Sequence, residues 1–362
     1  MREWYRRFRP ASRGNGERSG EFEGRRITVH VGANKTGSSA VQRFLGRNAA
    51  LLFRRENIVV PNKDFEWLKK VGPGNQVFAF QELLNGPEKE RGRLDEALGR
   101  IFRDHPETQR IVLSAENLAA HPEAPDLFSK LAEEYRVEVV MYVRRQDEFL
   151  LSSWQQWNSK ISTDFWAWLV SEVGRLGDWE AYLRNWERVV PKENIKVRVY
   201  ERPKLRDGDV VADFHAALGL RVPFDKLTYP KGSVNPSYSD EIMDLVKGND
   251  LIFDDAHDNR FYHFIAELTG DHFKKSSGES SITMAQRRTI LKRYEAQNRR
   301  VKERYLPRNS EIGAELFTQP TEEDYRYVPQ DELDRRKLEF LTTLVYRLHR
   351  RNSEQGNEKG SG

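Results

Sequence analysis

The chain has 362 residues, with 60 Lys and Arg against 56 Asp and Glu, and it contains no cysteine, which excludes a disulfide framework and a thiolate metal site. Residues 1–26 hold eight Arg and four Glu, and their net charge of +4 equals that of the whole chain. The basic pI of about 9.0 therefore comes from one end of the chain, and we expect no nucleic-acid partner.

Residues 1–24 are rich in Arg, Gly and Ser, and we expect a disordered basic tail there. Trp4, Tyr5 and Phe8 lie among the arginines, so peripheral contact with an anionic membrane surface is an alternative to a fully solvated tail. No stretch approaches the roughly 20 apolar residues of a membrane-spanning helix, and the beginning lacks the apolar core of a signal peptide. These features predict a cytoplasmic protein without a transmembrane segment.

The first predicted elements occupy residues 27–45, ITVHVGANKTGSSAVQRFL. Alternating β-branched residues at the start predict a strand, and apolar residues at helical spacing at the end predict a helix directly after a short polar loop. Gly32 and Gly37 bound this loop and let backbone amides approach a ligand, while the helix N-terminus favours an anion. Lys35 adds a positive charge. The loop therefore predicts an anion-binding site, with hydroxyl donors from Thr36, Ser38 and Ser39.

The rest of the chain alternates predicted strands and helices up to about Lys226 and then reads as helices only. An alternating order predicts a parallel sheet covered on both faces. We expect one domain over 25–350, of which 226–350 is mainly helical, followed by a polar tail over 351–362. The predicted strands are 58–61, 110–114, 137–143 and 194–200, and the predicted helices are 94–102, 127–135, 149–157, 210–218, 238–246, 261–268, 284–305 and 333–349.

The loop is not a Walker A loop, because Lys35 precedes the second glycine by two residues instead of following it. The order H-x-G-x-x-K-T-G-S-S-x-V-Q resembles the 5′-phosphosulfate loop of sulfotransferases that use 3′-phosphoadenosine 5′-phosphosulfate (PAPS), in the form found in bacterial members that act on glycans. The resemblance implies a three-layer α/β fold with a central parallel sheet of about five strands and the nucleotide at its carboxyl edge, and the sequence pattern adds a C-terminal helical region.

The same family binds the 3′-phosphate with an Arg at the end of a central strand and a Ser eight residues later. Arg144 and Ser152 match this spacing, with Arg145 and Ser153 as the alternative register. A guanidinium offers phosphate a bidentate fork, which a helix hydroxyl completes. The alternative is a polar turn between a strand and a helix that binds no ligand.

Two further segments resemble the family, and with the first of them, the Tyr-Glu pair, the matching motifs spread over about 175 residues. Tyr200 and Glu201 end a predicted strand, as does the family's Tyr-Glu pair near the adenine, although such a Tyr can also serve packing alone. Lys231 and Gly232 resemble the loop that closes on the 3′-phosphate. Ala40 replaces the aromatic residue found after the hydroxyl pair in other branches, so the aromatic partner of the adenine stays unassigned.

The resemblance implies transfer of a sulfuryl group to a hydroxyl of a carbohydrate or polysaccharide, leaving adenosine 3′,5′-bisphosphate (PAP). Lys35 would stabilise the leaving phosphate. Glu116 follows predicted strand 110–114 at the carboxyl edge and is the candidate general base, with His121 in reserve and an N-cap or ion pair as the structural alternative. His30, inside the first strand, is interpreted as a core residue. We expect no metal, because no His/Asp/Glu set has ligand spacing.

Six of the eight tryptophans fall between Trp154 and Trp186. Their helical spacing favours core packing, with Trp166 or Trp168 as candidates for an acceptor cleft. Two other functions remain open: a nucleotide-dependent kinase, which needs Mg²⁺ and an acidic ligand, and a glycan- or nucleotide-binding protein without activity. The sequence does not assign the acceptor, the position sulfated, O- versus N-sulfation or the oligomeric state.

Overall fold

The computed structural model describes residues 24–68, 74–87, 90–229, 239–270, 278–306 and 313–359. Most of the predicted basic tail and the Lys231-Gly232 segment lie outside these residues. Five strands form a central, wholly parallel sheet in the order β2-β3-β1-β4-β5, which confirms the predicted fold class. The strands are β1 (Arg26–Gly32), β2 (Ile58–Val59), β3 (Arg110–Ser114), β4 (Arg136–Val143) and β5 (Ile195–Val199).

The strands are apolar because helices cover both faces of the sheet. β1 lies in the middle and pairs with β3, where His30 is opposite Ser114, and with β4, where Val29 is opposite Val139. Since all strands are parallel, their carboxyl ends meet at one edge, and the loops that follow them lie close together.

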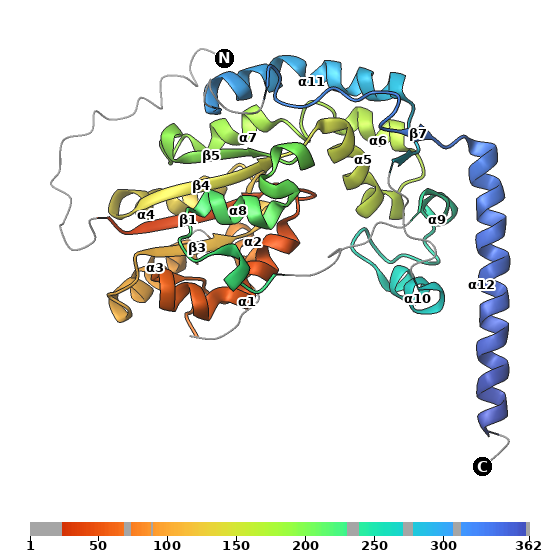
Figure 1. The fold of residues 1–362 in the computed structure, drawn as a ribbon, viewed down its shortest axis with the longest axis horizontal. Helices are drawn as coiled ribbons and strands as arrows, with labels where there is room; N and C mark the ends of the chain where they lie inside the picture. Colours follow the sequence, from red (N-terminus) through yellow and green to blue (C-terminus); the bar gives the residue numbers. More distant parts are fainter. Residues whose placement is uncertain are drawn as a thin grey trace.

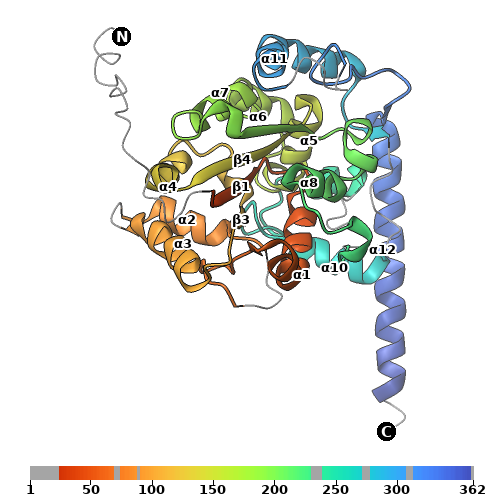
Figure 2. The same ribbon diagram turned by 60° about the vertical axis from the view of Figure 1, so that its left-hand side comes forward.

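One face of the sheet is covered by α1 (Ser38–Glu56) and α8 (Val210–Leu218), which bury Phe44 and Phe214 against Tyr142 of β4. The other face carries a larger core that includes β1 residues Val29 and Val31. Figures 1 and 2 show these three layers. The helices of the second face are α2 (Val77–Asn85), α3 (Gly92–Asp104), α4 (Ser129–Glu134), α5 (Gln146–Gln156), α7 (Trp179–Trp186) and α11 (Met284–Tyr305).

The C-terminal part has its own small core between α9 (Asp240–Val246), α10 (Arg260–Thr269) and α12 (Gln330–Lys359), with Phe340 at its centre. α12 extends past the rest of the molecule (Figure 1) and runs beyond the predicted end at residue 349. The expectation of helices only was wrong in one detail, because β6 (Glu279–Ser280) and β7 (Arg326–Tyr327) pair as a two-stranded sheet. None of the described helices combines the length and apolar character that crossing a membrane requires.

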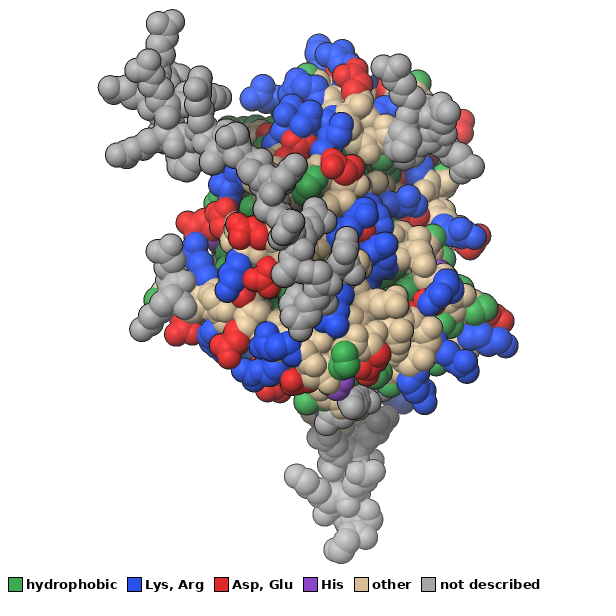
Figure 3. Space-filling view, turned by 90° about the vertical axis from the view of Figure 1, so that its left-hand side faces the viewer, with side chains coloured by type: hydrophobic (Ala, Val, Ile, Leu, Met, Phe, Trp, Pro, Cys, Tyr) green, Lys and Arg blue, Asp and Glu red, His purple; other side chains and the backbone are tan. Residues whose placement is uncertain are grey.

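The tryptophans mainly serve packing, as their spacing predicts. Trp154, Trp179 and Trp186 are buried. Trp166, on α6 (Phe165–Glu172), is exposed. Acidic and basic side chains are interspersed over the face drawn in Figure 3, as the balanced composition leads one to expect.

Candidate active site

Four strands deliver one chemically distinctive side chain each to a single cavity of about 730 Å³ at the carboxyl edge of the sheet. Lys35 comes from the loop after β1 and Glu116 from the turn after β3, while Arg144 and Tyr200 directly follow β4 and β5. The volume lies within the range of small-molecule sites. The cavity is lined by Asn34, Lys35, Gly37, Ser38, Ser39, Ala40, Glu116, Arg144, Ser152, Gln156, Trp157, Tyr200, Arg202, Leu205, Gly208, Asp209, Val210, Val211 and Tyr229.

Two glycines let the loop after β1 adopt its path. Gly37 is the N-cap of α1 with φ 83°, and a Cβ atom there would lie 2.9 Å from Cγ1 of Val210. Gly32 has φ 99°, and a Cβ atom there would lie 2.9 Å from Cα of Glu116. Both positions combine a left-handed backbone with close contacts, so glycine is required for the approach of neighbouring segments.

Lys35 lies in the loop with φ 60°, and its Nζ donates a hydrogen bond to Oε1 of Gln156 at 2.5 Å. Burial and the nearby charge of Arg144 lower the pKa of Lys35 to about 8. The partly desolvated ammonium is therefore held inside the cavity next to a second cation, an arrangement that an incoming anion would stabilise.

The loop hydroxyls differ in what they contact. The hydroxyls of Thr36 and Ser38 both donate to the carbonyl of Ala33, at 2.5 and 2.9 Å, and so hold the turn together. Ser38 and Ser39 line the cavity, whereas Thr36 is fully buried outside the cavity lining. In this geometry the hydroxyl of Thr36 serves the turn, and its binding to a ligand stays a prediction.

Of the two Arg/Ser registers, the structure brings Arg144 and Ser152 to the cavity. Nη1 of Arg144 donates to the carbonyl of Lys35 at 2.9 Å, which ties this side chain to the loop after β1. Ser153 is buried and does not line the cavity. Arg145 is paired with Asp147 at 2.7 Å, so it belongs to a separate polar network.

Glu116 accepts a hydrogen bond on Oε2 from the amide of Gln42, a residue of α1. His121 is not among the residues that line the cavity, and its Nδ1 accepts from the backbone N–H of Glu123 at 3.2 Å. Glu116 is therefore the better placed of the two candidate bases. His30 is fully buried with Nδ1 2.8 Å from Oγ of Ser114, and burial lowers its pKa to about 3, which confirms its interpretation as a core histidine.

Tyr200 lines the cavity, where its ring lies 5.7 Å from the guanidinium carbon of Arg144. Trp157 also lines it, whereas Trp166 and Trp168 do not, so the tryptophan of the cavity was missed. Its helical spacing with Trp154 indicated a core position, but α5 ends at Gln156 and turns Trp157 away from that stripe.

Other side chains of the cavity were also not identified from the sequence, among them Gln156, Asp209 and Tyr229. Gln156 lies one helical turn after Ser152, so helix periodicity from that residue would have found it. In the other two, the hydroxyl of Tyr229 donates a hydrogen bond to the carboxylate of Asp209, the N-cap residue of α8. Such a pairing between distant loops has no signal in the sequence.

Cations outnumber anions in the cavity, with Lys35, Arg144 and Arg202 against Glu116 and Asp209. This charge favours an anionic ligand. Within the described parts of the chain, no group of three or more His, Cys, Asp or Glu side chains has an arrangement that could hold a metal ion.

No protein-family model matches the chain. An uncharacterised protein from Archaeoglobus fulgidus is 26% identical over 205 residues, which cover 56% of this chain and 54% of that protein, so the match spans about half of the relative's length. The crystal structure of a sulfotransferase from Alicyclobacillus acidocaldarius is similar with a TM-score of 0.37 and 18% identity, over 58% of this chain and 86% of that one. A likeness of this size says nothing by itself about the reaction.

Proposed function

We propose that the protein is a sulfotransferase that moves a sulfuryl group from PAPS to a hydroxyl of a carbohydrate or glycan. The observation that carries the proposal is the convergence of Lys35, Arg144, Glu116 and Tyr200 on one cavity from the ends of four parallel strands. These residues come from segments far apart in the sequence, and each matches a separate part of the family's pattern. If the loop after β1 only happened to resemble an anion-binding loop, there would be no reason for Arg144, Glu116 and Tyr200 to line the same cavity.

Two cationic positions would bind the two charged ends of the donor. The loop after β1, with Lys35, Gly37 and the N-terminus of α1, would take the 5′-phosphosulfate, because helix N–H groups and a lysine favour an anion. Arg144 and Ser152 would take the 3′-phosphate. Aromatic side chains on two sides, Tyr200 and Trp157, offer faces for the adenine and for a sugar ring.

In the reaction, the acceptor oxygen forms a bond to sulfur while the bond from sulfur to the phosphate oxygen breaks. The electron pair of the broken bond stays on the phosphate, which leaves as PAP. Lys35 stabilises the charge that grows on this oxygen, and Glu116 takes the proton of the acceptor hydroxyl. The hydrogen bond from Gln42 orients the carboxylate of Glu116 for this role.

Ligand-induced thermal stabilisation and a transfer assay test the proposal together. PAP without metal should raise the melting temperature more than ATP does, because binding to the folded state adds to its stability. With labelled PAPS and a panel of polysaccharides, Lys35→Ala should lose transfer by about 10²-fold or more. Glu116→Gln should lower kcat by a similar factor with PAP affinity unchanged, while His121→Asn serves as the control of ordinary activity.

Three outcomes would contradict the proposal in different ways. Preference for ATP with Mg²⁺ over PAP would indicate a kinase. PAP binding without a sulfated product over the whole panel would indicate a binding protein. Full activity of Lys35→Ala would exclude the proposed mechanism while leaving the nucleotide site in place.

A further inference from the structure

The residues after β4 and β5 alternate between two environments. Arg144 and Tyr200 line the cavity, whereas the next residues, Arg145 and Glu201, contact residues 313–328, the link between α11 and α12 that we name the C-terminal strap. Nη1 of Arg145 donates to the carbonyl of Thr318 at 3.0 Å. The carboxylate of Glu201 accepts from the backbone N–H of Thr318 at 3.0 Å and from its hydroxyl at 3.0 Å. The strap is thus bonded directly behind the candidate nucleotide site.

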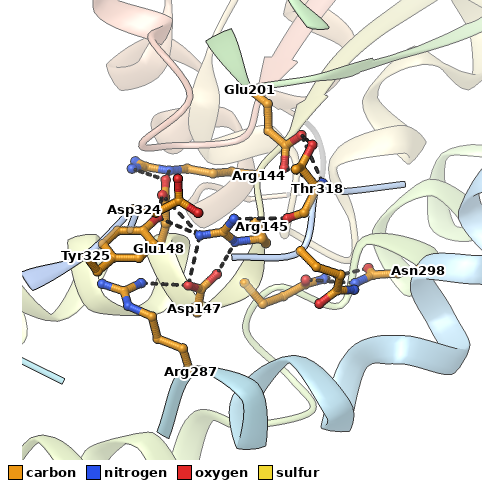
Figure 4. A network of polar contacts seen from close by, with 12 residues as sticks. Arg144, Arg145, Asp147, Glu148, Glu201, Arg287, Asn298, Thr318, Asp324 and Tyr325 are labelled. Atoms are coloured by element: carbon orange, nitrogen blue, oxygen red, sulfur yellow. Dashed lines mark hydrogen bonds and ion pairs between the residues drawn. The ribbon is translucent and has the colours of Figure 1, made fainter. Parts of the chain in front are cut away.

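Tyr325 is the strap residue that contacts both Glu148 and Arg145 (Figure 4). Its hydroxyl donates to Oε1 of Glu148, and it accepts from Nη2 of Arg145 at 2.6 Å. The guanidinium of Arg287 lies over its ring at 3.6 Å from the centroid. Because Arg287 covers one face of the Tyr325 ring and the hydroxyl is hydrogen-bonded, Tyr325 is fixed and in turn fixes the carboxylate of Glu148.

Glu148 uses its other oxygen to bind Arg144. Oε2 accepts from Nε of Arg144 at 3.2 Å and from Nη2 at 2.9 Å, while Nη1 donates to the carbonyl of Lys35. These bonds take three of the five guanidinium N–H groups. Among the described residues, one N–H on each terminal nitrogen is left, which is the pair that a phosphate fork needs.

We propose that Tyr325, acting through Glu148, is a positioning residue that orients Arg144 for the 3′-phosphate of the donor. The inference rests on the proposed function, since it presumes that Arg144 binds this phosphate. The physical reason is the cost of fixing a long side chain on binding, which is lower when the side chain is already held. The strap would thereby give the enzyme part of its preference for a nucleotide with a 3′-phosphate.

The test compares the dissociation constants of PAP and adenosine 5′-monophosphate by titration calorimetry. Tyr325→Phe removes only the hydroxyl. It should raise the dissociation constant of PAP by about three- to tenfold and leave that of the monophosphate unchanged. Glu148→Asp keeps the charge but is too short to reach Arg144 and Tyr325 together, so it should show the same selective loss. Tyr327→Phe, an exposed tyrosine two residues further on, is the matched control and should change neither constant.

Wild type and Arg144→Gln separate a failure of this inference from a failure of the proposed function. If wild type binds both nucleotides equally well, the 3′-phosphate site itself is wrong. If wild type prefers PAP and Arg144→Gln loses that preference, but Tyr325→Phe and Glu148→Asp keep it, the positioning role alone is overturned. The positioning role is also overturned if Tyr325→Phe weakens the binding of both nucleotides equally. Tighter binding of PAP by this variant would overturn it too, since Glu148 would then compete with the phosphate for Arg144.

Discussion

Lys35 lies in an environment unlike that of an ordinary surface lysine. Burial and Arg144 lower its pKa to about 8, so in the free protein the ammonium loses its proton as the pH rises through about 8. A bound phosphate group favours the protonated form. Above that pH, Lys35 must therefore take up a proton when the phosphate binds, and this requirement lowers the affinity.

We expect the PAP dissociation constant to be flat between pH 6.5 and 7.5 and to rise by up to about tenfold per pH unit above pH 8. Titration calorimetry at several pH values measures this slope directly. Lys35→Arg is the matched control, because a guanidinium stays charged over the whole range and should remove the slope. An equal slope in both proteins would assign the effect to another group.

At the residue scale, the sequence predicts the chemical types of the site better than the local contacts that hold them. Gly37, Lys35 and Arg144 could be located because a loop between a strand and a helix, and an Arg at a strand end, are local patterns. Trp157 could not, because its orientation depends on where α5 stops. Nor does the sequence show that the hydroxyl of Thr36 turns back to the carbonyl of Ala33.

At the scale of elements, the turn between β1 and α1 depends on the backbone freedom of Gly37. Alanine at this position would have an unfavourable φ of 83° and would place Cβ 2.9 Å from Val210 and 3.2 Å from Tyr200. Gly219, which ends α8, has φ 64° and nothing within 4 Å of such a Cβ atom. The two glycines therefore share the backbone cost and differ in the steric cost.

We expect Gly219→Ala to lower the free energy of unfolding by about 1 kcal/mol, the cost of a left-handed alanine, and Gly37→Ala to lower it by about 3 kcal/mol, since a contact is added. Urea unfolding followed by circular dichroism measures both. Equal losses would mean that α8 and the end of β5 shift freely and that the loop does not need a glycine for packing.

The elements themselves follow closely from periodicity where a helix or strand is bounded by clear breakers. The predicted bounds of 110–114, 210–218 and 284–305 coincide with β3, α8 and α11. α12 continues past residue 349, where Arg350 and Arg351 are good helix formers, although the polarity of this end suggested a tail. β6 and β7 are two residues each, too short to leave a periodic signal.

At the scale of the whole molecule, a buried ion pair joins α11 to α5, the helix that follows β4. Arg287 of α11 is 2% exposed and donates to Asp147 at 2.6 Å and to the hydroxyl of Ser280 at 2.8 Å. Asp147, fully buried at the start of α5, is also bonded to Arg145. The sequence contains all these residues but not their pairing, because Asp147 and Arg287 are 140 positions apart and the sequence pattern gives no register between α11 and α5.

Arg287→Met keeps an apolar stem but removes the guanidinium, and so leaves Asp147 with a single cationic partner in the interior. Breaking one side of a buried ion pair costs several kcal/mol, and since Arg145 remains, we expect a loss of about 3 kcal/mol in the free energy of unfolding. The neighbouring Arg288 is exposed and pairs with Glu322 at 3.4 Å, so Arg288→Met should cost less than about 1 kcal/mol.

Urea unfolding of the two variants and of wild type measures how much the ion pair between Arg287 and Asp147 adds to the free energy of unfolding. A near-neutral Arg287→Met would mean that the desolvation of Arg287 and Asp147 offsets their attraction, because both charges lose water on folding. In that case the apolar contacts of α11, such as Ile290 and Tyr294 in the core below it, would be what holds the C-terminal region against the sheet. A loss near 3 kcal/mol would instead assign that role to the ion pair and its neighbours.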